Sequence, residues 1–122
     1  MRAVATDDDV RRIALSLPET IEKPWYKTPG FRVKDKGFLR LRGEAEGGLV
    51  VFVSDEGEKQ MLVETEPEKF FTTPHYDGYP IVLINLTAIG VDELTELITE
   101  SWRLKAPKRV LKQYEDQLPG AS

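Results

Sequence analysis

The one histidine of the chain, His75, lies in an aromatic stretch where a general base could act. The stretch FFTTPHYDGYPIVLINL spans residues 70–86 and places Tyr76, Asp77 and Tyr79 near that imidazole in sequence. A histidine base needs a group to deprotonate and a partner that orients its ring. No serine, cysteine or lysine nucleophile stands at a recognisable motif spacing, and Asp77 precedes a glycine in a common turn dipeptide. We therefore expect a hydrogen-bonded structural histidine, no catalytic residues, and a protein that is not an enzyme.

The dipeptide Thr-Pro occurs twice beside aromatic residues, in WYKTPGF (residues 25–31) and in FFTTPHYDGY (residues 70–79). Ligand pockets are lined mainly by apolar and aromatic side chains with a few polar groups. Two loops of this kind could frame one small-molecule pocket. Its lining would consist of Trp25, Tyr26, His75, Tyr76 and Tyr79. The alternative, which the aromatic composition favours, is that both loops pack at the rim of the core.

The composition argues against metal and cofactor chemistry. The 122 residues include no cysteine, which excludes disulfides, thiolate metal sites and cysteine nucleophiles. A single histidine is too few for the usual zinc sites. Glycine-rich phosphate loops, dinucleotide-binding glycines and zinc-protease motifs are also absent. We expect no metal and no cofactor.

The net charge of −4 conceals a strong segregation of charge along the chain. Residues 23–42 carry seven basic side chains against Asp35 alone, and residues 103–112 carry five with no acid. Clustered basic residues are the electrostatic signature of nucleic-acid binding. The candidate nucleic-acid-binding residues are Arg32, Lys34, Lys36, Arg40, Arg42, Arg103, Lys105, Lys108, Arg109 and Lys112.

The environment of Phe38 decides how the first basic segment is interpreted. If strand 36–42 alternates regularly, Leu39 and Leu41 face one way and Phe38 joins the basic side chains, where its ring could stack on a base. A bulge would invert this assignment and put Phe38 in the core. The basic side chains would in that alternative pair with carboxylates of the acidic helices.

The second basic segment, WRLKAPKRVLKQY (residues 102–114), predicts an amphipathic helix that starts after Pro107. At about 100° per residue, its charged and apolar side chains fall on opposite sides. The cationic stripe consists of Lys108, Arg109 and Lys112. The apolar side consists of Val110, Leu111 and Tyr114. The stripe could contact phosphates, or it could be a solvated face whose cations complement the helix dipole.

Caps and apolar spacing predict three helices. The first spans residues 6–17, and the second spans residues 55–65 with Met61 and Leu62 on its apolar face. The third is capped by Asp92 and is kinked or split at Pro107.

Alternating and apolar runs predict the strands. Residues 31–34, 36–42 and 49–53 form an antiparallel meander, with a turn at EAEGG (residues 44–48). Residues 81–86 are apolar on both faces, which is typical of a central or doubly covered strand. The proline-rich residues 18–30 predict an extended loop.

Together these elements predict an α+β fold in a single domain, residues 1–122. Helices pack on an antiparallel sheet of about five strands in two layers, in the order α-β-β-β-α-β-β-α. No stretch is long and apolar enough for a leader or a membrane span. We expect a cytoplasmic protein with no membrane association.

Four motifs resemble the MmcQ/YjbR-like family of small bacterial proteins. They are ALSLPE (14–19), TPGFRV (28–33), TPHYDGYPIVLINL (73–86) and WRLKAPKR (102–109). The resemblance implies a YjbR-like two-layer fold similar to that of secretion chaperones, and a DNA-binding role with a winged arrangement. The positions that match are Thr28, Pro29, Phe31, Arg32, His75, Tyr76, Gly78, Tyr79, Pro80, Trp102, Pro107, Lys108 and Arg109. The chain departs at Gly30, where the pattern has alanine, and at Asn85, where arginine is common.

Three functions follow from the sequence as expectations. The first is a nucleic-acid-binding, non-enzymatic protein that uses the basic C-terminal helix and the basic sheet face. The second is a protein- or peptide-binding module like the secretion chaperones, and the third is a small-molecule site between the two Thr-Pro loops. The expected partners are thus nucleic acid or another protein, and the chain itself is expected to be a monomer or a weak homodimer.

Overall fold

The computed structural model describes residues 4–43 and 47–118. The helices are α1 (Asp7–Ser16), α2 (Glu56–Thr65), α3 (Val91–Lys105) and α4 (Lys108–Asp116), with short 3-10 helices η1 (Pro74–Tyr76) and η2 (Leu86–Ala88). The strands are β1 (Thr20–Trp25), β2 (Thr28–Val33), β3 (Lys36–Leu41), β4 (Leu49–Phe52), β5 (Phe70–Phe71) and β6 (Ile81–Ile84). Residues 44–46 of the predicted EAEGG turn lie outside the described residues.

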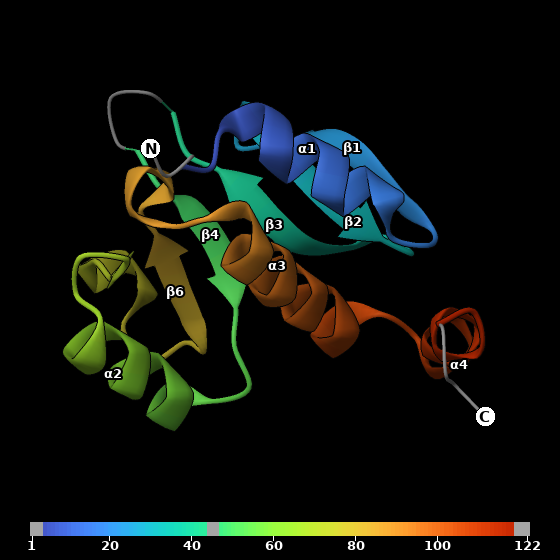
Figure 1. Ribbon diagram of the computed structural model, residues 1–122. Helices are drawn as coiled ribbons and strands as arrows, with labels where there is room; N and C mark the ends of the chain where they lie inside the picture. The colour runs from blue at the N-terminus through green and yellow to red at the C-terminus, as the bar shows by residue number, and fades with distance from the viewer. Residues whose placement is uncertain (1–3, 44–46, 119–122) are drawn as a thin grey trace.

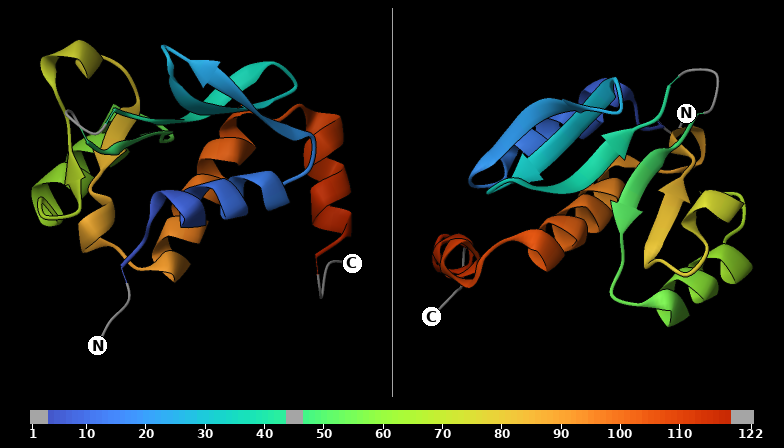
Figure 2. Two further views of the ribbon diagram at one scale, coloured as in Figure 1. Left: turned by 90° about the horizontal axis from the view of Figure 1, so that it is seen from above. Right: turned by 180° about the vertical axis from the view of Figure 1, so that it is seen from behind.

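The strands form one open antiparallel sheet in the order β1-β2-β3-β4-β6-β5. Helices α1 and α3 lie across one face, which we call the inner face, and α4 lies beyond the end of α3 (Figure 1). Seen from above, these helices occupy one side of the sheet, whereas the turn around residue 75 stands on the other (Figure 2). The predicted α+β fold with two main layers is therefore confirmed.

The main core lies between the inner face and helices α1 and α3. Its largest buried side chains include Trp102, Phe31, Phe38, Phe70 and Leu39, each less than 2% exposed. Burial of apolar area on this scale is the main source of folding stability. A second, smaller cluster lies on the opposite, outer face of the sheet and consists of Val50, Tyr76 and Leu83 with Phe71 and Ile81 packed against it. The predicted double coverage of residues 81–86 thus holds for strand β6.

Two of the three predicted helix starts are confirmed. Thr6 caps α1 in a full capping box, because its hydroxyl accepts from Asp9 N while the Asp9 carboxylate accepts from Thr6 N. The Asp55 carboxylate accepts from Glu58 N at 2.8 Å and caps α2. The prediction that Asp92 caps the third helix is wrong, since α3 begins at Val91 with Gly90 as its N-cap and Asp92 lies in the first turn.

The regular alternation predicted for strand 36–42 is wrong, because β3 contains a bulge. Phe31 pairs with Leu39 and Arg32 pairs with Gly37, so Phe38 is the extra residue of β3. Phe38 is fully buried in the main core and does not join the basic side chains on the outer face. A β-bulge inserts one residue without a ladder partner, and both Phe38 and Leu39 therefore contribute to the core.

The predicted loop at residues 18–30 contains strand β1 and the start of β2. Strand β1 forms the edge of the sheet and is exposed along most of its length, so its sequence lacks the apolar alternation that identifies a strand. Pro24 is tolerated there because an edge strand has an unpaired side. The predicted apolar face of α2 is confirmed for Leu62, which packs against the main core, and wrong for Met61, whose side chain is exposed. The buried residue of α2 is Lys59.

Among the described residues, no helix has the length and the apolar character that crossing a membrane requires.

Candidate ligand-binding pocket

A pocket of about 790 Å³ lies on the outer face of the sheet, between the β1–β2 hairpin and the η1 segment. This volume is within the range typical of small-molecule sites. The five residues predicted to frame a pocket, Trp25, Tyr26, His75, Tyr76 and Tyr79, all line it. Its apolar lining also includes Val50, Phe52 and Ile81. The structure thus brings the two Thr-Pro segments together, although they are more than forty residues apart in the chain.

Trp25 is seated by two glycines of the neighbouring strands. A Cβ added at Gly30 would lie 2.7 Å from the Trp25 Cβ, and one added at Gly37 would lie 2.6 Å from its Cη2, so neither position leaves space for a side chain. The Arg32 guanidinium carbon lies 5.7 Å from the Trp25 ring centroid, a cation–π contact. The alanine that the family pattern has at position 30 would therefore require Trp25 to move.

The turn that carries Tyr26 is strained. Tyr26 and Lys27 form the two-residue loop between β1 and β2, with φ angles of 54° and 64°. Positive φ at both positions is the type I′ geometry, which strongly favours Asn-Gly and similar pairs. Residues with a Cβ are disfavoured in the left-handed region, and such strain often occurs where side chains must be presented to a ligand. Tyr26 is 79% exposed at the rim of the pocket.

Arg40 supplies the best-defined cation of the pocket. Strand pairing with Val50 places it on the outer face, where its side chain is partly buried. Its guanidinium donates to the Thr28 hydroxyl at 3.1 Å and to the Tyr76 hydroxyl at 3.3 Å, and it lies 5.5 Å from the Tyr26 ring centroid. Within the described part of the chain, Arg40 has no carboxylate partner. Its positive charge is therefore available to an anion.

The wall opposite the hairpin is the η1 segment. Pro74 opens this short helix, and Tyr76 packs inward against the outer cluster while its hydroxyl reaches Arg40. The His75 ring contacts Tyr76 edge-on at a centroid distance of 4.8 Å, and it is exposed. No carboxylate pairs with His75 among the described residues, so the structure shows no triad-like arrangement there.

The ten predicted nucleic-acid-binding residues are divided among several environments. Lys34 pairs with Glu19 at 3.5 Å, and Arg103 pairs with Glu100 at 3.7 Å and Glu115 at 3.5 Å. Carboxylate pairing of this kind reduces the positive field that a polyanion would meet.

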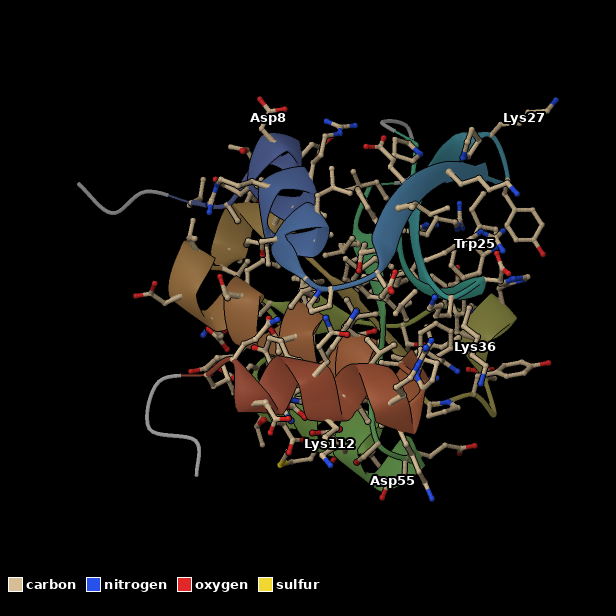
Figure 3. The ribbon with its side chains drawn as sticks, turned by 90° about the vertical axis from the view of Figure 1, so that its right-hand side faces the viewer. Asp8, Trp25, Lys27, Lys36, Asp55 and Lys112 are labelled. Carbon is tan, nitrogen blue, oxygen red and sulfur yellow. The ribbon has the colours of Figure 1, made fainter. Side chains whose placement is uncertain are left out.

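The remaining predicted cations lie on different surfaces. Arg40 and Arg42 line the pocket, and the Lys105 ammonium lies 4.0 Å from the ring centroid of Phe52, which also lines it. The exposed ones are Lys36, Lys108, Arg109 and Lys112. In Figure 3, Lys112 projects from α4 in a different direction from Lys36 at the sheet. The predicted amphipathic pattern of α4 is confirmed, since Val110 is buried while Lys108, Arg109 and Lys112 are exposed.

Several residues that shape the pocket carried no recognisable signal in the sequence. The floor residues Val50, Phe52 and Ile81 are ordinary strand residues, and only the strand register shows that they share the outer face. The role of Gly37 as part of the seat for Trp25 also depends on tertiary packing. Within the described residues, no cluster of three or more His, Cys, Asp or Glu side chains could hold a metal ion.

Comparison with known proteins finds relatives that this chain matches over most of their length. The family model named YjbR matches residues 15–104. Uncharacterized proteins of Mycobacterium tuberculosis and Mycobacterium bovis are 40% identical over 124 residues, covering 91% of this chain and 96% of each relative. A crystal structure of a Deinococcus radiodurans protein with a DUF419 domain is similar in fold, with a TM-score of 0.74 at 23% identity, and covers 100% of this chain and 99% of that one. The chain therefore belongs to the YjbR family.

Proposed function

We propose that the protein is a binding protein whose outer pocket takes an aromatic ring carrying an anionic group. The observation that carries the proposal is the guanidinium of Arg40, which is partly buried and lines the pocket. Among the described residues, its hydrogen-bond partners are two hydroxyl groups and no carboxylate. Aromatic side chains surround this charge. An acceptor such as a phosphate or carboxylate would match the planar guanidinium, and the ring of the same ligand would match the aromatic walls.

The expected contributions of the two halves of such a ligand are comparable. Stacking of one base on an aromatic side chain contributes about 1–3 kcal/mol, and a hydrogen bond to a charged group contributes about 1.5–3 kcal/mol. The exposed Tyr26 ring and the partly buried Trp25 ring line one side, and the exposed Tyr79 supplies a further ring on the other. Neither half alone should suffice for tight binding, because association itself costs several kcal/mol.

A nucleotide unit has this chemistry, and it has two sources. One is a free mononucleotide, and the other is an unpaired base with its phosphate in a single nucleic-acid strand. The second source keeps nucleic-acid binding as a second candidate, supported by the exposed Lys108, Arg109 and Lys112 on α4, which have no carboxylate partner in the described part of the chain. Such a strand would have to contact α4 as well as the pocket.

Calorimetric titration with three small probes tests the proposal. Adenosine 5′-monophosphate (AMP) supplies ring and anion, adenosine supplies the ring, and inorganic phosphate supplies the anion. AMP should bind at least about tenfold more tightly than either half, and Arg40→Met should weaken AMP by about tenfold or more. Lys112→Met is the matched control, since it removes one positive charge from α4 and should leave AMP binding unchanged.

An oligothymidylate titration separates the two sources. If a strand binds through α4, reversing Lys108, Arg109 and Lys112 to glutamate should weaken its binding to the level of AMP and reduce its salt dependence, while AMP binding persists. If the pocket takes a free nucleotide only, the strand should bind no better than AMP. Equal binding of AMP to wild type and Arg40→Met would remove the pocket as the anion site.

A further inference from the structure

Lys59 is a buried lysine whose ammonium is held by backbone carbonyls. Lys59 lies in the middle of α2, and the residue as a whole is 8% exposed. The Nζ atom donates to the Tyr76 carbonyl at 2.6 Å and to the Tyr79 carbonyl at 3.1 Å. Among the described residues no carboxylate lies within ion-pair distance of it.

Burying this ammonium without a carboxylate partner lowers the stability of the folded protein unless its hydrogen bonds stabilise another part of the structure. Burial of a lysine costs side-chain entropy and desolvation of the charge, and two carbonyls compensate less than a carboxylate would. Methionine would fill a similar volume without a buried charge. A lysine at this buried position is thus best explained by the two backbone carbonyls that its ammonium binds.

That segment is the aromatic wall of the pocket. Residues 73–79 are held internally by short-range backbone bonds, from Tyr76 N to Thr73 O and from Tyr79 N to Tyr76 O, while the following residue is joined to the end of β4 by the bond from Val53 N to Pro80 O at 2.9 Å. Apart from the packed Tyr76 side chain, this turn is exposed, and exposed turns open easily where few contacts tie them to the core. Lys59 ties the wall to α2 at two of its carbonyls, directly behind the residues that face the pocket.

A continuous set of contacts then crosses the pocket. Lys59 holds the Tyr76 carbonyl, the Tyr76 hydroxyl accepts from Arg40, and Arg40 also donates to Thr28 in the hairpin. We propose that Lys59 is a positioning residue of the outer pocket, which fixes the Tyr76–Tyr79 wall at the distance that allows Arg40 and the aromatic rings to bind one ligand. This inference rests on the proposed function for its ligand, but the fixing of the wall can be measured without any ligand.

Hydrogen exchange of backbone amides, followed by NMR, tests the positioning role in the full chain. In Lys59→Met the Tyr79 and Ile81 amides, which bond Tyr76 O and Tyr79 O, should exchange at least about tenfold faster than in wild type. Amides of β3 and β4 should keep their wild-type rates. Lys59→Arg retains a cationic donor and should restore most of the protection. Gln60→Met, at an exposed neighbouring position of α2, is the matched control and should leave the wall unchanged.

AMP affinity is then measured for the same variants. We expect Lys59→Met to weaken AMP by about tenfold and Lys59→Arg to restore it at least in part. If Lys59→Met does not fold, Lys59→Gln serves the same comparison, because its amide is one bond shorter than the ammonium and does not reach both carbonyls.

The outcomes distinguish the two proposals. Unchanged exchange of the Tyr79 and Ile81 amides in the Lys59 variants overturns the positioning role, whether or not AMP binds. Faster exchange with unchanged AMP affinity also overturns it, because the wall would then not belong to the site. If AMP fails to bind wild type while exchange accelerates as expected, the proposed function fails and only the anchoring of the wall by Lys59 stands.

Discussion

Ser101 provides the most quantitative test of how α3 holds strands β3 and β4 together beneath the pocket. This serine of α3 is fully buried, donates to the Phe38 carbonyl at 2.6 Å and accepts from the Phe52 amide at 3.0 Å. Strands β3 and β4 pair from Leu39 to Leu41 only, so the hydroxyl bridges the two strands where their ladder has ended. Ser101→Ala removes this bridge, and the buried Phe38 carbonyl and the partly buried Phe52 amide each lose the hydrogen bond that they make with the hydroxyl.

The expected cost follows from those two groups. An unsatisfied buried donor or acceptor costs about 1–3 kcal/mol, and the lost hydroxyl leaves only a small void. Partial relaxation of the strands should offset some of this, so we expect the free energy of unfolding to fall by about 2–4 kcal/mol. A domain of this size has a total stability of about 5–15 kcal/mol, and the variant should therefore still fold.

Urea unfolding of wild type and Ser101→Ala measures this difference. The matched control is Thr95→Ala on the same helix, which removes an exposed hydroxyl bonded to Val91 O and should change stability by less than about 0.5 kcal/mol. A loss below about 1 kcal/mol for Ser101→Ala would refute the reasoning, because the two backbone groups would then have found other partners.

Three further predictions concern the hairpin and its neighbours. Lys27→Gly should stabilise the protein by about 0.5–1 kcal/mol, since glycine relieves the left-handed strain of the turn at some cost in chain entropy, and a lower urea midpoint would contradict this. Gly37→Ala should displace the indole of Trp25, lower stability by about 1–3 kcal/mol and shift tryptophan emission, so an unchanged spectrum would count against the packing described. Hydrogen bonds from Arg11 lower the pKa of Glu22, so this pair contributes stability above the ordinary pKa of 4.5 that is lost as pH falls through the lowered value. Glu22→Gln should accordingly be less stable than wild type at neutral pH, and urea unfolding at a series of pH values should show this difference shrinking as the pH falls below 4.5.

The sequence predicted most of the fold because most elements carry local signals. The capping box of Thr6 and Asp9 and the Asp55 cap fix two helix starts through contacts three residues apart. The apolar run that forms β6 is recognisable because the strand is covered on both faces. Strand β1 is not recognisable in the sequence, because an exposed edge strand needs no apolar pattern. Residues 20–25 are extended because they pair with β2 in the folded sheet.

The site was predictable in part. The repeated Thr-Pro segments with their aromatic neighbours pointed to Trp25, Tyr26, His75, Tyr76 and Tyr79, and the structure brings all of them to one pocket. The sequence is compatible both with regular alternation and with the observed bulge at Phe38, because both registers satisfy the local pattern.

The residues that support the site were not predictable. Lys59 looks like any surface lysine of an amphipathic helix, and its burial depends on a turn seventeen residues away. Ser101 likewise acts on Phe38, which is 63 residues distant in the chain. Single-sequence patterns report the periodicity of one element and contain no information about which backbone groups a distant side chain will satisfy.

The claim that an aromatic anion binds on the outer face is tested most directly by a chemical-shift map of the 15N-labelled protein during titration with AMP. We predict that the largest shifts fall on the Trp25 indole N–H and on the backbone amides of Tyr26, Arg40 and Tyr76. Shifts concentrated on α4, or none at millimolar AMP, would contradict it.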